Sequence, residues 1–195
     1  VDWLWNAIPA AGHWILFSVL AGLLVWFAWG QRGIPQPEGY AMVTRSDLHA
    51  MSWIHENTPA EAMFLVEGFR IYVGTSAVGA DAGWWIPLLS GRPNTMPPQY
   101  ALFNEVPLEA GYSQQVVDIV EALETVMLDL PQAINVLCRY DIDYIYIGQT
   151  QGLTGAGVSQ LYSPEELLAQ PMIKLVYHRD RVYIFALPPE VCEGD

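Results

Sequence analysis

The chain has 195 residues, of which 52% are hydrophobic, and it carries a formal net charge of −13. The hydrophobic content is too high for a disordered protein. The acidity argues against nucleic-acid binding, which needs basic surfaces, and against adhesion of the charged part of the chain to anionic lipid headgroups.

An apolar run dominates residues 1–30, which are predicted to span a membrane. The run extends from Ile8 to Trp29 without Asp, Glu, Lys or Arg, and His13 is its one strongly polar side chain. About 20 apolar residues suffice for a helix to cross the hydrocarbon core. A signal peptide is disfavoured because nothing basic precedes Ile15. A helix of a soluble core is disfavoured because five tryptophans surround the run without amphipathic relief.

These tryptophans stand on both sides of the run, as in the aromatic belts of membrane interfaces. They are Trp3, Trp5, Trp14, Trp26 and Trp29. The sequence therefore predicts a protein of the inner or plasma membrane, whose partners are the lipid bilayer and other transmembrane helices or subunits.

Residues 31–45 are rich in glycine and proline and are predicted to be a linker. For the orientation, the positive-inside rule has only Arg32 to act on, and taken literally it places the following domain inside. Long domains cross membranes largely regardless of charge, so one arginine decides little. The chain begins at Val1 without a methionine, which we interpret as a processed product or a fragment of a longer membrane protein whose upstream spans would set the topology.

Residues 46–195 are predicted to form one α/β domain with a small mixed sheet. In its first half, a helix is predicted to start at a cap, Ser46 or Asp47, and to run through His55, with Leu48, Met51 and Ile54 on its inner face. A buried strand at 62–66 and a glycine-rich loop at 67–83, with a brief strand at 70–73, follow. The next segments are an edge strand or extended segment at 84–89 around Pro87 and an irregular stretch at 90–100.

The second half holds the clearest amphipathic helix of the chain. Its predicted elements are, in order, that helix at 113–130, a helix at 131–139 opened by Pro131, a strand at 144–147, a flexible loop at 148–157, a helix capped by Ser163, and a hairpin of strands at 172–177 and 182–187.

The candidate contact residues of the domain are Trp84, Trp85 and Arg92. They lie in a proline-stiffened segment, 81–99. Tryptophan rings offer stacking area for sugar or lipid, and an arginine can bind phosphate or carboxylate bidentately. In the alternative interpretation, the tryptophans belong to the core and Arg92 makes a structural ion pair.

The remaining motifs are interpreted as structural. Asp141 and Asp143 have the spacing of a metal-binding pair, but a polar turn between a helix and a strand accounts for them. The glycines of 148–157 match no phosphate-binding pattern. Histidines and cysteines show no metal-ligand spacing, and no nucleophile motif is present, so no catalytic residue, metal or cofactor is predicted.

Cys138 and Cys192 are the two cysteines of the chain. In an extracytoplasmic domain they could form a disulfide that pins the C-terminus to the core. Because sequence alone shows no proximity between them, two unlinked thiols are predicted.

Six short motifs follow one another in the chain. They are WIHENTP (53–59), AMFLV (62–66), WWIPLLSGR (84–92), DYIYIG (143–148), LVYH (175–178) and VYIF (182–185). Their order resembles the C-terminal extracytoplasmic domain of large bacterial GT-C-type membrane glycosyltransferases, the class of the oligosaccharyltransferase catalytic subunit and the protein mannosyltransferases. The resemblance covers residues 13–187.

The resemblance implies a last membrane span, a linker and an extracytoplasmic α/β domain of an enzyme that transfers sugar from a lipid-phosphate donor. The catalytic acids of that family lie in loops between early spans, which this chain lacks, so no catalytic residue is carried over. Trp84 and Trp85 are also not followed by the aspartate and tyrosine of the oligosaccharyltransferase acceptor motif.

Two functions follow from these patterns. The first is a membrane-anchored, non-catalytic domain that frames the acceptor side of a glycosyltransferase-like protein or docks to a partner, with a lipid-linked sugar as a further ligand. Ten or more spans encoded upstream of Val1 would support it. The alternative is a single-span accessory subunit of a larger membrane complex, such as a pigment- or cofactor-bearing assembly.

Overall fold

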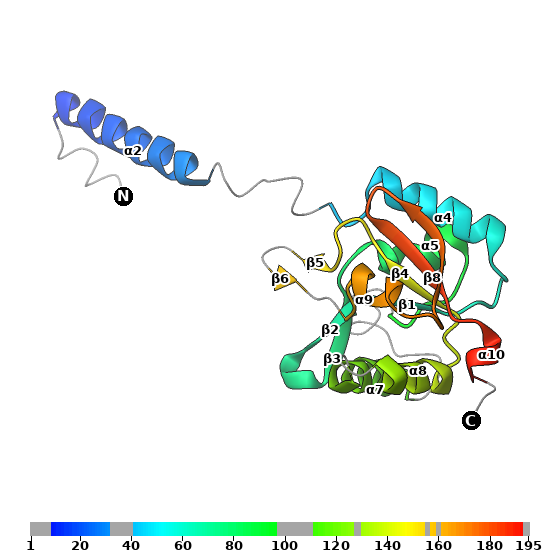
Figure 1. Cartoon of the computed structure of the whole chain (residues 1–195). Helices are drawn as coiled ribbons and strands as arrows, with labels where there is room; N and C mark the ends of the chain where they lie inside the picture. The colour runs from blue at the N-terminus through cyan, green and yellow to red at the C-terminus, as the bar shows by residue number, and fades with distance from the viewer. Residues whose placement is uncertain are drawn as a thin grey trace. The chain divides into compact units, whose positions relative to one another are not determined.

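The computed structural model describes residues 9–31, 41–96, 111–126, 130–154, 157–158 and 161–192. The chain divides into two compact units, Val1–Glu38 and Gly39–Asp195 (Figure 1). The first unit contains helix α2 (Ala10–Gly30), and the second contains the α/β domain.

Helix α2 confirms the predicted helical run. Its segment Gly12–Gly30 is long and apolar enough to cross a membrane, and none of it is buried in the structure. The rings of Trp14, Trp26 and Trp29 are 73%, 75% and 68% exposed. Trp3, Trp5 and most of the predicted linker lie outside the described residues.

The domain is built on a four-stranded mixed sheet, as predicted. Its strands are β1 (Phe64–Val66), β4 (Tyr144–Ile147), β8 (Val182–Ala186) and β7 (Lys174–Arg179), in the order β1-β4-β8-β7. The pair β1–β4 is parallel, and the pairs β4–β8 and β8–β7 are antiparallel. The parallel pair matters because both of its strands end at the same edge of the sheet.

The two faces of the sheet bury different side chains, because successive residues of a strand point to opposite sides. Phe64, Tyr146 and Ile184 belong to a core cluster with α4 (Arg45–Asn57). Leu65 and Phe185 belong to a second cluster with α8 (Leu130–Arg139) and α9 (Pro164–Leu168). Figure 1 shows α4 and α8 on opposite sides of the sheet.

Helix α4 begins earlier than predicted. Thr44 is its N-cap, and Thr44 and Asp47 form a capping box, so Ser46 and Asp47 lie inside the first turn. The inner face follows the helical spacing Asp47, Ala50, Met51 and Ile54, all buried, while Leu48 is 48% exposed. The prediction of Leu48 inside was wrong because its position lies off this stripe.

Residues 67–83 form more than a loop. Strands β2 (Gly68–Ile71) and β3 (Ser76–Gly79) make an antiparallel hairpin around the turn η2 (Tyr72–Gly74). Tyr72 and Val73 have φ of 50° and 59°, a conformation that such residues rarely adopt, which is why the turn carried no sequence signal.

The segment 84–89 is helical, so the prediction of an edge strand or an extended segment was wrong. It forms η3 (Ala82–Trp85) and α5 (Ile86–Ser90). The side chain of Asp81 accepts from Gly83 N and opens η3. Pro87 lies in the first turn of α5, where a missing N–H costs no helical hydrogen bond, so the proline favours a helix start here.

The remaining elements mostly confirm the predictions. The helix pair is α7 (Tyr112–Val126) and α8, with Leu130 in the second helix rather than the first. Ser163 caps α9 in a capping box with Glu166. The loop 148–157 contains two short paired strands, β5 (Leu153–Thr154) and β6 (Gly157–Val158).

Cys138 and Cys192 form a disulfide, so the prediction of unlinked thiols was wrong. The Cα atoms are 5.4 Å apart, within the range that a disulfide allows. The bond joins α8 to the C-terminal helix α10 (Pro189–Cys192). The sequence separation of 54 concealed the proximity of the two cysteines, which arises only when α10 folds against α8.

Candidate functional site

Three carboxylates are buried near the edge at which β1 and β4 end. Glu67 directly follows β1, Asp81 precedes η3, and Asp47 comes from α4. Their residues are 4%, 0% and 0% exposed. Ligands of α/β proteins commonly bind at the carboxyl ends of parallel strands. The acidic cluster (Asp47, Glu67 and Asp81) is therefore a candidate site by its position.

Asp47 is saturated with hydrogen bonds. One carboxylate oxygen accepts from Tyr146 Oη at 2.8 Å and from Gln149 N at 2.9 Å. The other accepts from Thr44 N at 2.8 Å and Thr44 Oγ1 at 2.7 Å. This carboxylate therefore ties the start of α4 to the end of β4.

Asp81 and Glu67 bind backbone N–H groups. The Asp81 oxygens accept from Gly83 N and Gly148 N, each at 2.8 Å, and Glu67 Oε2 accepts from Leu161 N at 2.7 Å. Burial, and to a smaller extent the charge of Asp81, raises the pKa of Glu67 from 4.5 to about 8. Burial likewise raises the pKa of Asp81 from 3.8 to about 7, against the lowering effect of its two N–H donors.

The acidic cluster organises backbone rather than performing chemistry. Each carboxylate lies inside the core and fixes a loop at the end of the sheet. A catalytic acid or base must reach its substrate within hydrogen-bond distance, and these buried groups face peptide N–H donors. Within the described residues, no group of three or more His, Cys, Asp or Glu side chains could hold a metal ion.

Trp84 and Trp85 differ in their burial. Trp84 packs against the core cluster of α4 and β1, and a Cβ placed on Gly79 would overlap its indole nitrogen. That Nε1 atom is buried without a hydrogen-bond partner in the described part of the chain. Trp85 is 38% exposed, next to Leu88 (74%) and Leu89 (40%) of α5.

Arg92 binds carbonyl groups at the end of α4. Its Nη2 donates to His55 O at 2.7 Å and Thr58 O at 2.9 Å, its Nε donates to Thr58 Oγ1 at 3.2 Å, and its Nη1 donates to Ser90 O at 3.2 Å. The last carbonyls of a helix lack intrahelical partners. The guanidinium supplies these partners and joins the end of α4 to the end of α5.

The structure therefore separates the three predicted contact residues. Trp85 offers an exposed ring, Trp84 supports the position of η3, and Arg92 holds α5 against α4. Sequence reasoning did not single out Glu67 or Asp81. The available signal was an acid directly after the buried strand at 62–66, since side chains at that position lie at the carboxyl edge of a sheet.

Asp141 and Asp143 lie between α8 and β4, as the turn interpretation predicted. Asp141 has a positive φ of 52°, and Asp143 Oδ2 accepts from Met63 N at 2.8 Å. The second carboxylate thereby joins the starts of β4 and β1.

Comparison with known proteins gives a distant structural likeness. Among the solved structures that this chain resembles is the C-terminal globular domain of the oligosaccharyltransferase from Archaeoglobus fulgidus, with a TM-score of 0.46 and 13% sequence identity over 75% of this chain and 99% of that one. That protein is archaeal and lends no support to the bacterial origin that the sequence motifs imply. No protein-family model matches the chain, and no curated protein matches it significantly.

Proposed function

We propose that the chain is the membrane-anchored, non-catalytic extracytoplasmic domain of a glycosyltransferase-like membrane protein. The observation that carries the anchoring is α2, whose apolar segment Gly12–Gly30 is exposed on all sides. Its first turn has no acidic residue and its last turn no basic one. So much apolar surface is strongly unfavourable in water, and lipid or neighbouring helices would cover it.

The disulfide supports the extracytoplasmic side. Disulfides persist in oxidising compartments and are rare in the cytosol, where thiols are kept reduced. Cys138 and Cys192 are paired, and no free cysteine is present. A domain held by this bond fits a location outside the cytoplasm.

The exposed surface of α5 is the proposed contact for the acceptor side or a partner. Trp85, Leu88 and Leu89 form an apolar group there, and Arg92 fixes its position through the carbonyls of α4. An exposed apolar group with a tryptophan is typical of a binding surface. The glycosyltransferase part of the proposal rests on the order of the six sequence motifs.

Two measurements on native membranes test the proposal. An antibody against the domain should detect a polypeptide far larger than the 21.8 kDa of this chain, which stays in the membrane after alkaline extraction. A reporter enzyme that is active only in an oxidising compartment, fused after the domain, should be active. A band at 21.8 kDa in a stable complex would instead favour the single-span accessory subunit.

Cross-linking tests the α5 surface. A photo-reactive amino acid at Leu88, which is 74% exposed, should capture a membrane-embedded segment that carries lipid-linked-sugar transferase activity. The matched control is the same amino acid at Leu168 on α9, which is 52% exposed. Equal capture from both positions, or none from Leu88, would contradict the contact.

A further inference from the structure

Three exposed arginines gather at one end of the acidic domain. The hydrogen bond from Ser46 Oγ to Asp180 Oδ2, 3.2 Å long, joins the first turn of α4 to the turn between β7 and β8. Arg45 is the neighbour of Ser46, and Arg179 and Arg181 flank Asp180. All three arginines are exposed. We call Arg45, Arg179 and Arg181 the arginine end.

The backbone that carries the arginine end is held in place. Asp180 and Arg181 have φ of 47° and 70°, so the strands meet in a tight turn. Gln149 Nε2 donates to Asp180 O at 3.1 Å, and Arg181 Nη2 donates to Gln151 Oε1 at 2.7 Å. The loop after β4 therefore braces the turn, and little order has to be gained when a ligand binds.

The local charge opposes the charge of the whole chain. Asp180 interacts with Arg179 at 3.5 Å, with both side chains more than half exposed, and such a pair is weak. Asp47 is fully buried. Arg45 has no partner among the described residues, and Arg181 bonds only a neutral amide there. This end is thus basic within a chain of net charge −13.

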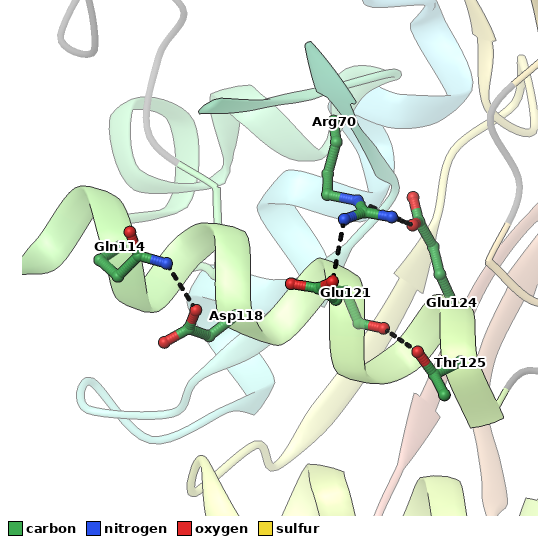
Figure 2. A network of polar contacts seen from close by, with 6 residues as sticks. All are labelled: Arg70, Gln114, Asp118, Glu121, Glu124 and Thr125. Carbon is green, nitrogen blue, oxygen red and sulfur yellow. Dashed lines mark hydrogen bonds and ion pairs between the residues drawn. The ribbon is translucent and has the colours of Figure 1, made fainter. Parts of the chain in front are cut away.

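In Figure 1, helix α7 lies at the bottom of the domain and helix α4 at the top. Figure 2 shows that Arg70 bonds Glu121 at 3.2 Å and Glu124 at 2.7 Å, and that Asp118 lies on the same helix. One arginine against three carboxylates leaves this surface acidic. The domain is therefore polarised, with positive charge at the arginine end and negative charge on α7.

The arginine end is also where the chain enters the domain. Residues 41–44 lead directly into α4. Nine residues, 32–40, lie between Gln31, at the end of α2, and Ala41, and these ten Cα–Cα steps span at most about 34 Å. Arg45 therefore follows Gln31 by only fourteen positions in the sequence.

We propose that the arginine end binds the phosphates of anionic lipid headgroups and orients the domain on the bilayer. The inference rests on the membrane anchoring proposed above. Guanidinium groups bind phosphate oxygens bidentately and are always charged. The acidic α7 is repelled from the same surface, so both charges favour one orientation. Each arginine near an anionic surface strengthens attachment by about fivefold.

Hydrogen–deuterium exchange on the full chain in nanodiscs tests the inference. The nanodiscs contain phosphatidylcholine alone or with about one-third phosphatidylglycerol, which supplies the anionic surface. Amides of residues 178–182 should exchange at least about fivefold more slowly with the anionic lipid at low salt, and the difference should shrink to less than about twofold near 1 M salt.

A charge-matched pair of variants supplies the control. The variant Arg45→Gln with Arg181→Gln should lose the lipid-dependent slowing. The variant Arg139→Gln with Lys174→Gln, which removes the same charge from α8 and from the far end of β7, should keep it. The inference would be overturned by equally slow amide exchange in both lipids. It would also be overturned if both variants lost the lipid-dependent slowing equally.

A separate readout distinguishes failure of the anchoring. The chain should co-purify with nanodiscs of either lipid and resist alkaline extraction, because α2 is uncharged. Stable incorporation without lipid-dependent exchange would overturn only the proposal that the arginine end binds anionic headgroups. Failure to incorporate in either lipid would overturn the anchoring and, with it, this inference.

Discussion

Arg92 shows how much one residue depends on its surroundings. A lone arginine after a tryptophan-rich segment suggests a ligand for phosphate or carboxylate. In the folded domain its donors instead bond five oxygens at the ends of α4 and α5. The planar guanidinium reaches these positions together, which an ammonium group cannot do.

Replacement of Arg92 by lysine should therefore destabilise the domain. We expect a loss of about 1–3 kcal/mol, because carbonyls at the end of α4 lose their partners. Urea unfolding of the full chain in detergent measures the effect. The matched control is Arg139→Lys on the exposed side of α8, and equal costs for both variants would contradict the role of Arg92.

Glu67 makes the stability of the domain depend on pH. Burial raises its pKa from 4.5 to about 8, so the folded state keeps a proton that the unfolded chain releases above about pH 4.5. This contribution to stability is full below pH 4.5 and is lost as the pH rises to about 8. Asp81, with its pKa raised to about 7, acts in the same direction.

The variant Glu67→Gln should weaken this dependence. Between pH 5 and pH 8 the unfolding free energy of the natural chain should fall by up to about 1.4 kcal/mol per pH unit for each such group. In the variant one group no longer contributes, and the slope should be smaller. Thermal unfolding at a series of pH values measures this slope, and the exposed Glu61→Gln is the control. If the slope were the same in both variants as in the natural chain, Glu67 would not be the group responsible.

At the scale of elements, predictions succeeded where signals were local. Ser163, Pro164 and Glu166 identify the start of α9, because the cap, the proline and the acid all act within one turn. The predictions failed where residues outside a segment determine its structure. The segment 84–89 contains a proline and reads as extended, but Asp81 opens a helical turn there.

The link between α8 and α10 depends on the disulfide. Cys138→Ser with Cys192→Ser should lower the unfolding free energy by about 4 kcal/mol on a chain-entropy account, given the 54-residue separation. Urea unfolding measures the loss. A reducing agent should produce a similar loss in the natural chain and none in the variant. Alkylation of both cysteines in the unreduced, folded protein would show that the bond is absent.

At the scale of the whole molecule, the two units differ in what they bury. The domain hides its apolar side chains in two clusters around the sheet, whereas α2 hides none of its apolar window. A helix of this kind is stabilised by what surrounds it rather than by its own fold. Anchoring therefore depends on the uniform absence of charge along α2.

Two lysines in α2 should release the chain from membranes. Leu20→Lys with Leu24→Lys places two charges near the middle of the helix, each costing about 2.5–3.5 kcal/mol on insertion scales. Alkaline extraction should move this variant to the soluble fraction. Leu20→Ile with Leu24→Ile should stay with the membrane, and retention of the lysine variant would argue against a span.

Hydrophobic runs were enough to predict the apolar helix, the α/β class and the strands at 62–66 and 144–147, because such runs can be recognised without knowing what they pack against. Which polar groups meet depends on how the chain folds. The pairing of Cys138 with Cys192, the carbonyls around Arg92 and the burial of Glu67 beside Asp81 join residues far apart in the chain. Composition averages charge over the whole surface, so a net charge of −13 concealed a basic end that appears only when α4 and the β7–β8 turn come together.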